Sequence, residues 1–340
     1  MATRLIGELK SSAVISRHRK NPVLKASDVP YPAALIFNAG VAKYEGKYVM
    51  VFRNDYGSIE EQRIDGTNLG LAFSDDGVKW QVEPNPCWEL KTDEITRIYD
   101  PRLTVIEGRC YLCFAVDTYH GVCGGVAVTE DFQKFEILSI SAPENRNMVL
   151  FPEKINGMYL RLERPFPVYG RVQDEWFDIW ISDSPDLKYW GHSQLLLAVE
   201  HVPFANAKIG PAAPPVKTKH GWLTVFHSVD KDYSRGKNGW EDKWQKRYCA
   251  GIMLLDQDNP YKIKGICPEP LIAPEAPYEI SGGFRNNAVF PCGMVLEDDG
   301  EVKIYYGAAD ITTCLVTADV DDLIGLCKKP DFKVPMNFGL

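Results

Sequence analysis

The sequence contains no long apolar run. None of its apolar segments approaches the ~18–20 residues that a membrane-spanning helix needs. The N-terminal stretch MATRLIGELKSSAVISRHRK includes Glu8 and has no continuous apolar segment, so it lacks the pattern of a secretory signal peptide. We therefore expect a cytoplasmic protein with no membrane partner.

Motifs for metals, nucleotides and disulfide frameworks are also missing. No H-E-x-x-H motif, Gly-rich phosphate loop or zinc-type group of Cys and His occurs. The 9 cysteines are odd in number and irregularly spaced. Cys110 and Cys113 lie in a strand-like run, where residues three apart point to opposite faces. We expect reduced thiols, no metal and no organic cofactor.

The chain also lacks an excess of basic charge. Its 340 residues carry a formal net charge of −8, which argues against a nucleic-acid partner because phosphate backbones bind basic surfaces. A small anionic substrate is still compatible with this charge, because a local basic cluster can lie inside an acidic protein.

Helical periodicity is almost absent, and a strand–turn–strand unit recurs instead. Each copy has an apolar strand, a short turn with Gly, and an apolar-aromatic strand that ends in a polar residue. The turn glycines of the five copies are Gly46, Gly108, Gly157, Gly221 and Gly300. Further strands ending in acidic turns follow most copies, as in LGLAFSDDGVKW and DIWISDSPDLKYW.

Five repeats of three to four strands predict an all-β fold, a five-bladed β-propeller with its site in the central funnel. A pair of β-sandwich domains is the alternative, but it would not repeat one turn signature along the whole chain. No linker-like segment divides the sequence, so we expect a single domain over residues 1–340. Residues 1–30 are expected to form an N-terminal extension and residues 320–340 a C-terminal tail; these ends would either close the ring or cover a contact in a homo-oligomer.

Polar residues recur at two positions of the repeat, the start of the first strand and the end of the second. The first group is Asn38, Asp100, Arg146-Asn147, Lys208 and Asn286-Asn287. The second group is Arg53, Asp55, Asp117, Arg164, His227, Asp230 and Asp310. Because first strands line the channel of a propeller, we expect these side chains to converge at one end of it.

The convergent set mixes carboxylates with cations. Carboxylates suit sugar hydroxyls, and an inverting glycosidase needs two carboxyl groups about 6.5–9.5 Å apart with a water between them. Arg146, Arg164 and Lys208 do not help to bind water, whereas arginine and lysine do bind phosphate. The cations therefore favour phosphorolysis, with phosphate as the nucleophile.

Several motifs in series resemble glycoside hydrolase family 130, the β-mannoside phosphorylases. They are FNAGV, YDPR, NRNMVLFPEKINGMYLRLERP, KIGPAAPP, GWLTVFHSVD, NAVFPCG and YYGAAD, in an order that runs from about Asn21 to about Ala318. The resemblance implies a five-bladed propeller and inverting phosphorolysis of β-mannosides to α-D-mannose 1-phosphate. Inorganic phosphate would then be the co-substrate.

The resemblance also implies roles for individual residues. Asp100 of YDPR would be the general acid, acting through the mannose 3-hydroxyl. The phosphate-binding set would be Arg146, Asn147, Arg164, Lys208, Tyr248 and His227. The residues that hold the mannose would be Asn38, Arg53, Tyr99, Phe290 and Asp310. Arg63 is a further candidate for substrate binding, in a stretch NDYGSIEEQRIDG that is longer than the family pattern leads us to expect.

The sequence leaves several alternatives open. The linkage is β-1,4 or β-1,2, and the acceptor is a manno-oligosaccharide, glucose or N-acetylglucosamine, because the loops within residues 164–178 and 230–248 would shape that subsite. A β-mannosidase, another five-bladed glycosidase using Asp55, Asp100 and Glu153, and a non-catalytic sugar-binding propeller are the other candidates. A general-acid role for Asp100 requires that Arg102 does not pair with its carboxyl group, because such a pair would lower its pKa.

Overall fold

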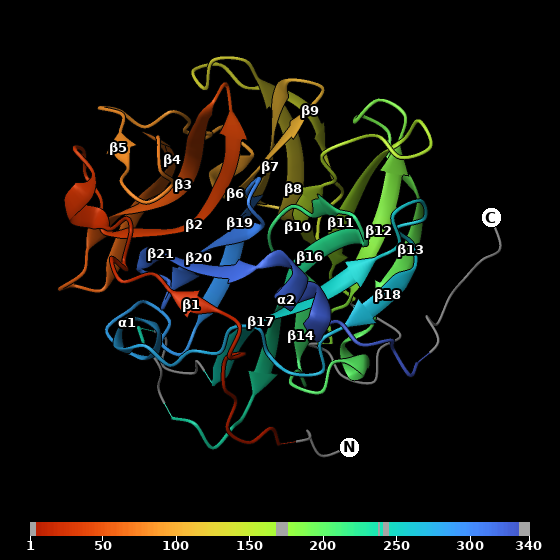
Figure 1. The fold of residues 1–340 in the computed structure, drawn as a ribbon. Coiled ribbons are helices and arrows are strands. Elements are labelled where there is room, and N and C mark those ends of the chain that lie inside the picture. The colour runs from red at the N-terminus through yellow and green to blue at the C-terminus, as the bar shows by residue number, and fades with distance from the viewer. Residues whose placement is uncertain (1–4, 168–175, 237–238, 241–244, 333–340) are drawn as a thin grey trace.

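Five separate antiparallel sheets are arranged around a common centre in the computed structural model of the chain (Figure 1). The structure describes residues 5–167, 176–236, 239–240 and 245–332. The predicted five-bladed β-propeller is confirmed, and the pair of β-sandwich domains is excluded. Parts of the two loops within 164–178 and 230–248 lie outside the described residues.

The first three blades follow one another along the chain, each running from the innermost strand to the rim. Blade 1 consists of β2 (Leu35–Tyr44), β3 (Lys47–Ser58), β4 (Arg63–Ser74) and β5 (Gln81–Val82). Blade 2 consists of β6 (Ile95–Ile106), β7 (Arg109–Thr118), β8 (Gly121–Thr129) and β9 (Glu136–Ile140). Blade 3 consists of β10 (Asn145–Leu150), β11 (Tyr159–Pro165), β12 (Ile179–Ser184) and β13 (Gly191–Leu197).

The last two blades complete the ring. Blade 4 consists of β14 (Lys208–Pro211), β15 (Val216–Thr218), β16 (Gly221–Lys231), β17 (Lys246–Leu255) and β18 (Ile263–Ile266). Blade 5 consists of β19 (Val289–Leu296), β20 (Glu301–Ala308), β21 (Thr312–Asp319) and the N-terminal β1 (Ser16–Arg17). The helical segments are the short η1 (Ala26–Asp28), η2 (Val199–His201), α1 (Pro277–Ile280) and α2 (Val320–Leu326).

The two ends of the chain meet in the fifth blade. β1 pairs antiparallel with β21, so that Ser16 lies opposite Thr317 and Arg17 opposite Val316. Part of the expected N-terminal extension is therefore a strand of the propeller, since it supplies the outermost strand of the last blade. α2, in the expected C-terminal tail, packs Val320 and Ile324 against a hydrophobic cluster formed by residues of blades 4 and 5.

The repeated glycines occupy equivalent hairpin turns. Each lies at the start of the second long strand of its blade or one to two residues before it, with a φ of 79° at Gly46, 77° at Gly108 and 80° at Gly157. Gly221 and Gly300 have φ values of 136° and 93°. Residues with a Cβ rarely adopt such positive φ values, so the turn geometry explains why glycine recurs there.

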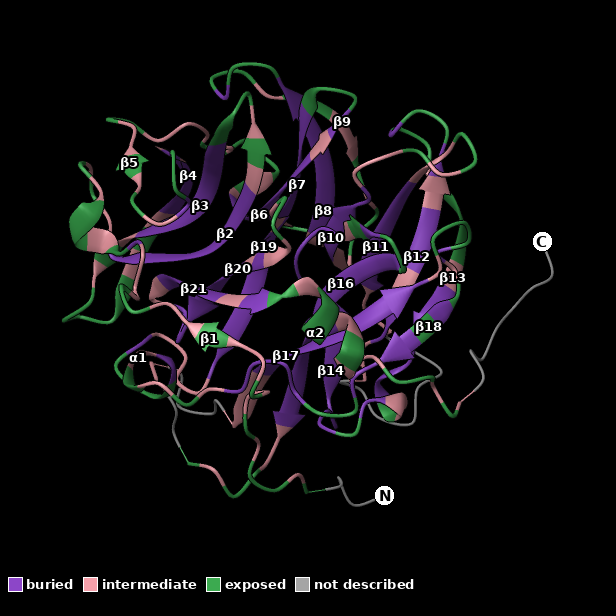
Figure 2. Cartoon of the chain, viewed as in Figure 1, coloured by how far each residue is buried: buried purple, intermediate pink, exposed green. Residues whose placement is uncertain are grey.

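The apolar faces of neighbouring blades pack against each other to form the core. Figure 2 shows that the inner strands are buried along most of their length and that the loops at the rim are exposed. One hydrophobic cluster spans blades 4 and 5, and another spans blades 1 and 2. This packing holds the inner strands, and therefore the side chains at their ends, in fixed positions.

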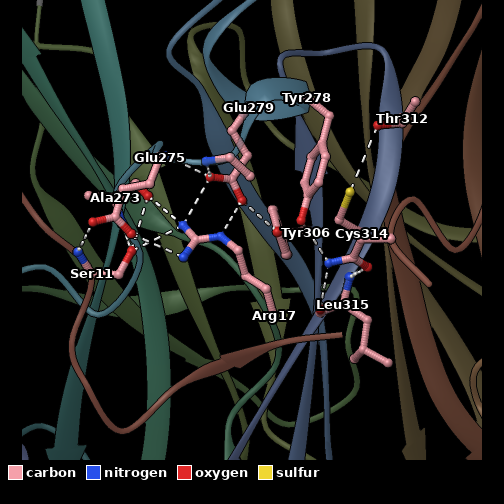
Figure 3. Close-up of polar contacts among 12 residues, drawn as sticks. Ser11, Arg17, Ala273, Glu275, Tyr278, Glu279, Tyr306, Thr312, Cys314 and Leu315 are labelled. Atoms are coloured by element: carbon pink, nitrogen blue, oxygen red, sulfur yellow. Dashed lines mark hydrogen bonds and ion pairs between the residues drawn. The ribbon is translucent and has the colours of Figure 1, made fainter. Parts of the chain in front are cut away.

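A partly buried ionic cluster joins the N-terminal segment to the fifth blade (Figure 3). The Arg17 guanidinium binds Glu279, at 2.8 Å, and Glu275, at 3.0 Å. Glu279 is fully buried and also accepts hydrogen bonds from the hydroxyl of Tyr306 and from the main-chain N–H groups of Glu275 and Ala276 at the start of α1. The cluster thereby fixes α1 just before the loop that leads to β19.

Candidate functional site

The first strands of blades 1, 2 and 3 share the same β-bulge. In each blade, two residues of the first strand lie opposite one residue of the second, and the first of the two is Asn38, Asp100 or Asn147. These residues have φ values of 51°, 54° and 58°, in the left-handed region that asparagine and aspartate tolerate better than most residues. A bulge changes the direction of a side chain, so this repeated irregularity explains how three blades present a polar group to the same cavity.

That cavity lies where the inner strands meet and has a volume of about 140 Å³. Its lining residues are Asn38, Arg53, Ile64, Arg97, Tyr99, Asp100, Arg146, Asn147, Arg164, Tyr248, Phe284, Arg285, Ala288, Phe290 and Asp310. Ten of these residues are among those singled out in the sequence. Of the remaining candidates, Lys208, His227 and Arg63 are not part of the cavity wall.

Asp100 lies in the cavity wall and is 7% exposed. Its carboxyl oxygen Oδ1 accepts a hydrogen bond from Asn38 at 2.9 Å and lies 3.4 Å from the Arg53 guanidinium. Burial raises the pKa of Asp100, but the charges of Arg53, Arg102 and Arg146 outweigh it and lower the pKa to about 2. In the protein without ligands, Asp100 is therefore an ionised carboxylate at neutral pH.

Arg102 does not form an ion pair with the carboxyl group of Asp100. Its guanidinium donates to the main-chain carbonyls of Asp100 and Ala212. No bidentate Arg102–Asp100 pair, which would contradict a general-acid role, occurs among the described residues. Arg53 is the arginine that approaches the Asp100 carboxylate, and it lowers the pKa of Asp100 together with the charge of Arg102. The neutral Asp100 that a general acid requires is therefore not present in the protein without ligands.

Two other carboxyl groups accompany Asp100. Asp55 is fully buried and holds Arg53 through two hydrogen bonds, of 2.9 and 2.7 Å, and it accepts a third from Thr67. Asp310 lines the cavity and lies 3.3 Å from the Arg285 guanidinium. Burial raises the pKa of Asp310, and Arg285 and Arg53 offset this only in part.

The cationic side of the cavity contains Arg146 and Arg164, which face each other on the paired strands β10 and β11. Arg164 is 2% exposed, and its Nε and Nη2 have no hydrogen-bond partner in the described chain. Arg146 donates to the Tyr99 hydroxyl at 3.0 Å, and its Nε also has no partner there. Neither guanidinium forms an ion pair with a described carboxylate, so both retain donors for an anion.

Burial and, to a smaller extent, the nearby charge of Arg146 together lower the pKa of Arg164 to about 9. Even so, this guanidinium is charged at neutral pH. The protein thus maintains a buried cation without a protein counter-ion, at a cost to its own stability.

His227 lies behind Arg164, outside the cavity wall. Its Nδ1 is 3.2 Å from the Pro211 carbonyl, so Nδ1 carries the hydrogen and Nε2 accepts from Arg164 Nη1 at 2.9 Å. Burial, together with the charges of Arg164 and Lys208, lowers the pKa of His227 well below its usual value. A neutral His227 in this tautomer orients Arg164, which differs from the predicted direct contact with phosphate.

Lys208 is also buried behind the wall, at 8% exposure. Its ammonium lies 5.5 Å from the ring of Phe177 and 5.9 Å from the ring of Tyr248. Tyr248 does line the cavity, so Lys208 adds positive charge to the same side of the site from a second layer.

Arg63 and Glu153 lie at the surface. Arg63 is half exposed and pairs with Glu61 and Asp65, so the structure does not bring it to the cavity that contains Asp100. Glu153 pairs with Lys217 at 2.6 Å, and both side chains are partly exposed. Asp55, Asp100 and Glu153 therefore do not converge as the three-carboxylate glycosidase alternative requires.

Sequence reasoning missed Arg97, Phe284 and Arg285 in the cavity wall. Arg97 is two residues before Tyr99 on β6, and this alternation would have placed both on one face of the strand. Phe284 and Arg285 lie in a loop with no repeat counterpart. The only signal for them is their position next to the Asn286-Asn287 pair.

No cluster of three or more His, Cys, Asp or Glu residues suited to a metal ion occurs among the residues that the structure describes. Within the same residues, no helix has the length and apolar character needed to cross a membrane.

The comparisons with known proteins identify this five-bladed propeller, with carboxyl groups and buried arginines at its centre, as a carbohydrate-active enzyme. Residues 13–329 match the family model of glycoside hydrolase family 130, described as β-1,4-mannooligosaccharide phosphorylase. The chain belongs to glycoside hydrolase family 130.

Curated and solved relatives agree with this assignment. The chain is 33% identical to the β-1,4-mannooligosaccharide phosphorylase of Ruminococcus albus, over 93% of this chain and 91% of the relative. It is 29% identical to a 1,2-β-oligomannan phosphorylase of Thermoanaerobacter sp., over 91% of this chain and 98% of the relative. The structure of the Listeria innocua β-1,2-mannobiose phosphorylase with β-1,2-mannobiose is similar, with a TM-score of 0.77 and 25% identity over 92% of this chain and 98% of that chain.

Proposed function

We propose that the chain catalyses the inverting phosphorolysis of β-1,4-linked manno-oligosaccharides, giving α-D-mannose 1-phosphate and a sugar one unit shorter. The β-1,4 linkage is proposed because the family model and the 33% identical relative both carry that specificity in their names. A β-1,2-mannoside phosphorylase is the second candidate, favoured by the similarity to the Listeria and Thermoanaerobacter enzymes.

One observation carries the choice of phosphate as the nucleophile. Arg146 and Arg164 line the cavity that contains Asp100, and both have donors without partners in the described residues. A buried guanidinium without a counter-ion is unfavourable unless a ligand anion compensates it. Phosphate offers three or more acceptor oxygens to such donors and matches the fork of a guanidinium. A hydrolase, whose nucleophile is water, would gain nothing from this pair of charges.

The proposal assigns Asp100 as the general acid. In the reaction, phosphate would attack the anomeric carbon from the arginine side of the cavity while the proton of Asp100 reaches the glycosidic oxygen through the mannose 3-hydroxyl. Since Asp100 is ionised in the protein without ligands, it must take up a proton when substrates bind. Phosphate provides the means, because its negative charge would offset that of Arg146, one of the cations that lower the pKa of Asp100, and so raise this pKa.

The remaining wall would hold the mannose. Asn38 and Arg53 are fixed by Asp100 and Asp55 and present their polar groups to the cavity, and Asp310 lies on the same wall. Tyr99 and Phe290 supply the apolar surface against which a sugar ring could lie. Lys208 and His227 are proposed to act from the second layer, by adding charge and by orienting Arg164.

The test is a comparison of linkages in the presence of phosphate. β-1,4-mannobiose, β-1,2-mannobiose and 4-O-β-mannosyl-glucose would each be incubated with the enzyme and phosphate, and the sugar phosphate identified by NMR. We expect α-mannose 1-phosphate from β-1,4-mannobiose at the highest kcat/KM. A higher value for β-1,2-mannobiose would select the second candidate, and a β-anomeric product would exclude inversion.

A further inference from the structure

A second hollow lies next to the cavity that contains Asp100. This groove has a volume of about 280 Å³ and shares Ile64 and Arg97 with the cavity wall. The shared lining residues place the groove directly beside the cavity. None of the predicted functional roles uses the groove.

The groove lies between blades 1 and 2. One wall is the hairpin formed by the end of β3 and the start of β4, and it contributes Tyr56 and Asp65 to the lining. The opposite wall is the segment between β5 and β6, and it contributes Glu89 to the lining. Thr96 and Arg97, at the start of β6, contribute to the lining as well. The first wall coincides with the stretch NDYGSIEEQRIDG, whose length stood out in the sequence.

Tyr56 lines this groove. It lies opposite Gly66 across the β3–β4 pair, and its ring covers the space that a Cβ at residue 66 would occupy. Gly66 thus allows the ring to lie against the strand. No hydrogen bond or ring contact of the Tyr56 side chain occurs with another described residue, and the side chain is half-buried. An aromatic face of this kind suits the apolar face of a sugar ring.

Both walls are held in place by the residues around them. Arg63, which the cavity does not use, pairs with Asp65 on the hairpin. On the opposite wall, the main chain of Trp88 forms an isolated antiparallel β-bridge with Leu69 of β4. The Trp88 ring packs against the Phe114 ring, with 5.1 Å between the ring centroids. Glu89 follows immediately after this anchor. The groove therefore exists before any ligand binds.

The charges of the groove are balanced, in contrast to those of the cavity. Asp65 is paired with Arg63, and Arg97 is paired with Asp117 at 2.6 Å. Glu89 and Lys91 are exposed and opposite in sign. This arrangement offers both donors and acceptors but no cluster of one sign, which matches a neutral polyhydroxylated ligand better than an anion.

We propose that this groove is a distal acceptor subsite that binds the mannosyl units of a neutral β-manno-oligosaccharide beyond those at the cleaved bond. The inference rests on the proposed function, and it adds a preference for longer chains. Tyr56 would carry one sugar ring by stacking, and Glu89 would accept a hydroxyl hydrogen bond from the other wall.

The test compares chain lengths. Release of mannose 1-phosphate would be measured from β-1,4-linked mannobiose and mannotetraose in excess phosphate, and the ratio of their kcat/KM values calculated. We expect wild type to prefer the tetraose about tenfold, equivalent to about one stacking contact. Tyr56→Ala should lower the ratio about tenfold, and Glu89→Ala should lower it about threefold, as for one lost hydrogen bond.

Two controls accompany these variants. Tyr189, which is 76% exposed in the turn after β12, provides the matched replacement Tyr189→Ala, and it should leave the ratio unchanged. Glu89 is exposed, so Glu89→Ala decides the question if Tyr56→Ala does not fold. The groove proposal would be overturned by a ratio near one in wild type, or by a ratio that is unchanged both in Glu89→Ala and in a folded Tyr56→Ala. In either case, turnover of mannobiose would still support the proposed function. Absence of mannose 1-phosphate from both substrates would overturn the two together.

Discussion

Replacement of Arg164 by methionine should stabilise the protein while it destroys the phosphate site. Arg164 is a buried guanidinium whose Nε and Nη2 have no partner in the described chain and whose nearest charged neighbours include Arg146. A methionine side chain is unbranched like that of arginine, so it occupies much of the same space with apolar atoms and carries no charge. The variant therefore separates the cost of the unpaired charge from its use in binding an anion.

The magnitude follows from the pKa of Arg164. Its lowering from 12.5 to about 9 corresponds to about 5 kcal/mol, at about 1.4 kcal/mol per pKa unit. Because the folded-state pKa of this cation is the lower one, the full penalty applies below about pH 9 and is relieved as the pH rises from 9 toward 12.5. The lost hydrogen bond to His227 and the imperfect fit of methionine act in the opposite direction. We expect a net gain of about 2 kcal/mol in the free energy of unfolding at pH 7.

The assay is urea unfolding of wild type and Arg164→Met at pH 7, with and without phosphate. Wild type should gain about 2.7 kcal/mol at a phosphate concentration of 100 times Kd, whereas the variant should gain nothing. A less stable variant that still responds to phosphate would refute the reasoning.

Arg161 provides the matched control, three residues earlier on the same strand. Its guanidinium is buried but paired with Glu163 at 2.8 Å. Arg161→Met leaves that buried carboxylate without its cation, so the variant should lose about 3–5 kcal/mol of stability. It should keep the response to phosphate, because Arg161 is not part of the cavity wall.

Three further predictions concern the proton and the N-terminal segment. Asp100→Asn should lower mannose 1-phosphate formation about 10³-fold and change mannobiose affinity, measured by calorimetry, much less; equal losses in both would assign Asp100 to binding alone. Phosphate should raise the pKa of Asp100 from about 2, so calorimetry in buffers of different ionisation enthalpy should show more proton uptake by wild type than by Asp100→Asn; equal uptake would contradict the proton-loading step. Arg17→Ala should cost about 3–5 kcal/mol in urea unfolding, because it leaves fully buried Glu279 without its cation; a loss below about 1 kcal/mol would show that the cluster contributes little.

The blade pattern could be predicted from the sequence because it depends on local geometry. A hairpin turn with positive φ selects glycine, and five such glycines recur at the same place in each blade. The bulges are local features as well, and they explain why Asn38, Asp100 and Asn147 occur at one position of the repeat. Ten of the thirteen site candidates consequently line the cavity.

The sequence pattern could not predict which residues line the cavity and which lie behind its wall. Whether His227 touches a ligand or orients Arg164 depends on the direction of its side chain, which is set by the Pro211 carbonyl from another strand. Lys208 likewise lies between the rings of Tyr248 in its own blade and Phe177 in blade 3, a position that depends on packing between blades. Arg285 comes from a loop without a counterpart in the repeat, positioned through the hydrogen bond from its N–H to Ala309.

The central claim is that the buried arginines make phosphate, and not water, the nucleophile. The most direct measurement is the product released from β-1,4-mannobiose as the phosphate concentration is raised from zero. The account predicts no turnover without phosphate, and α-mannose 1-phosphate as the product at a rate that saturates with phosphate. Free mannose released at the same rate without phosphate would contradict it and identify the enzyme as a hydrolase.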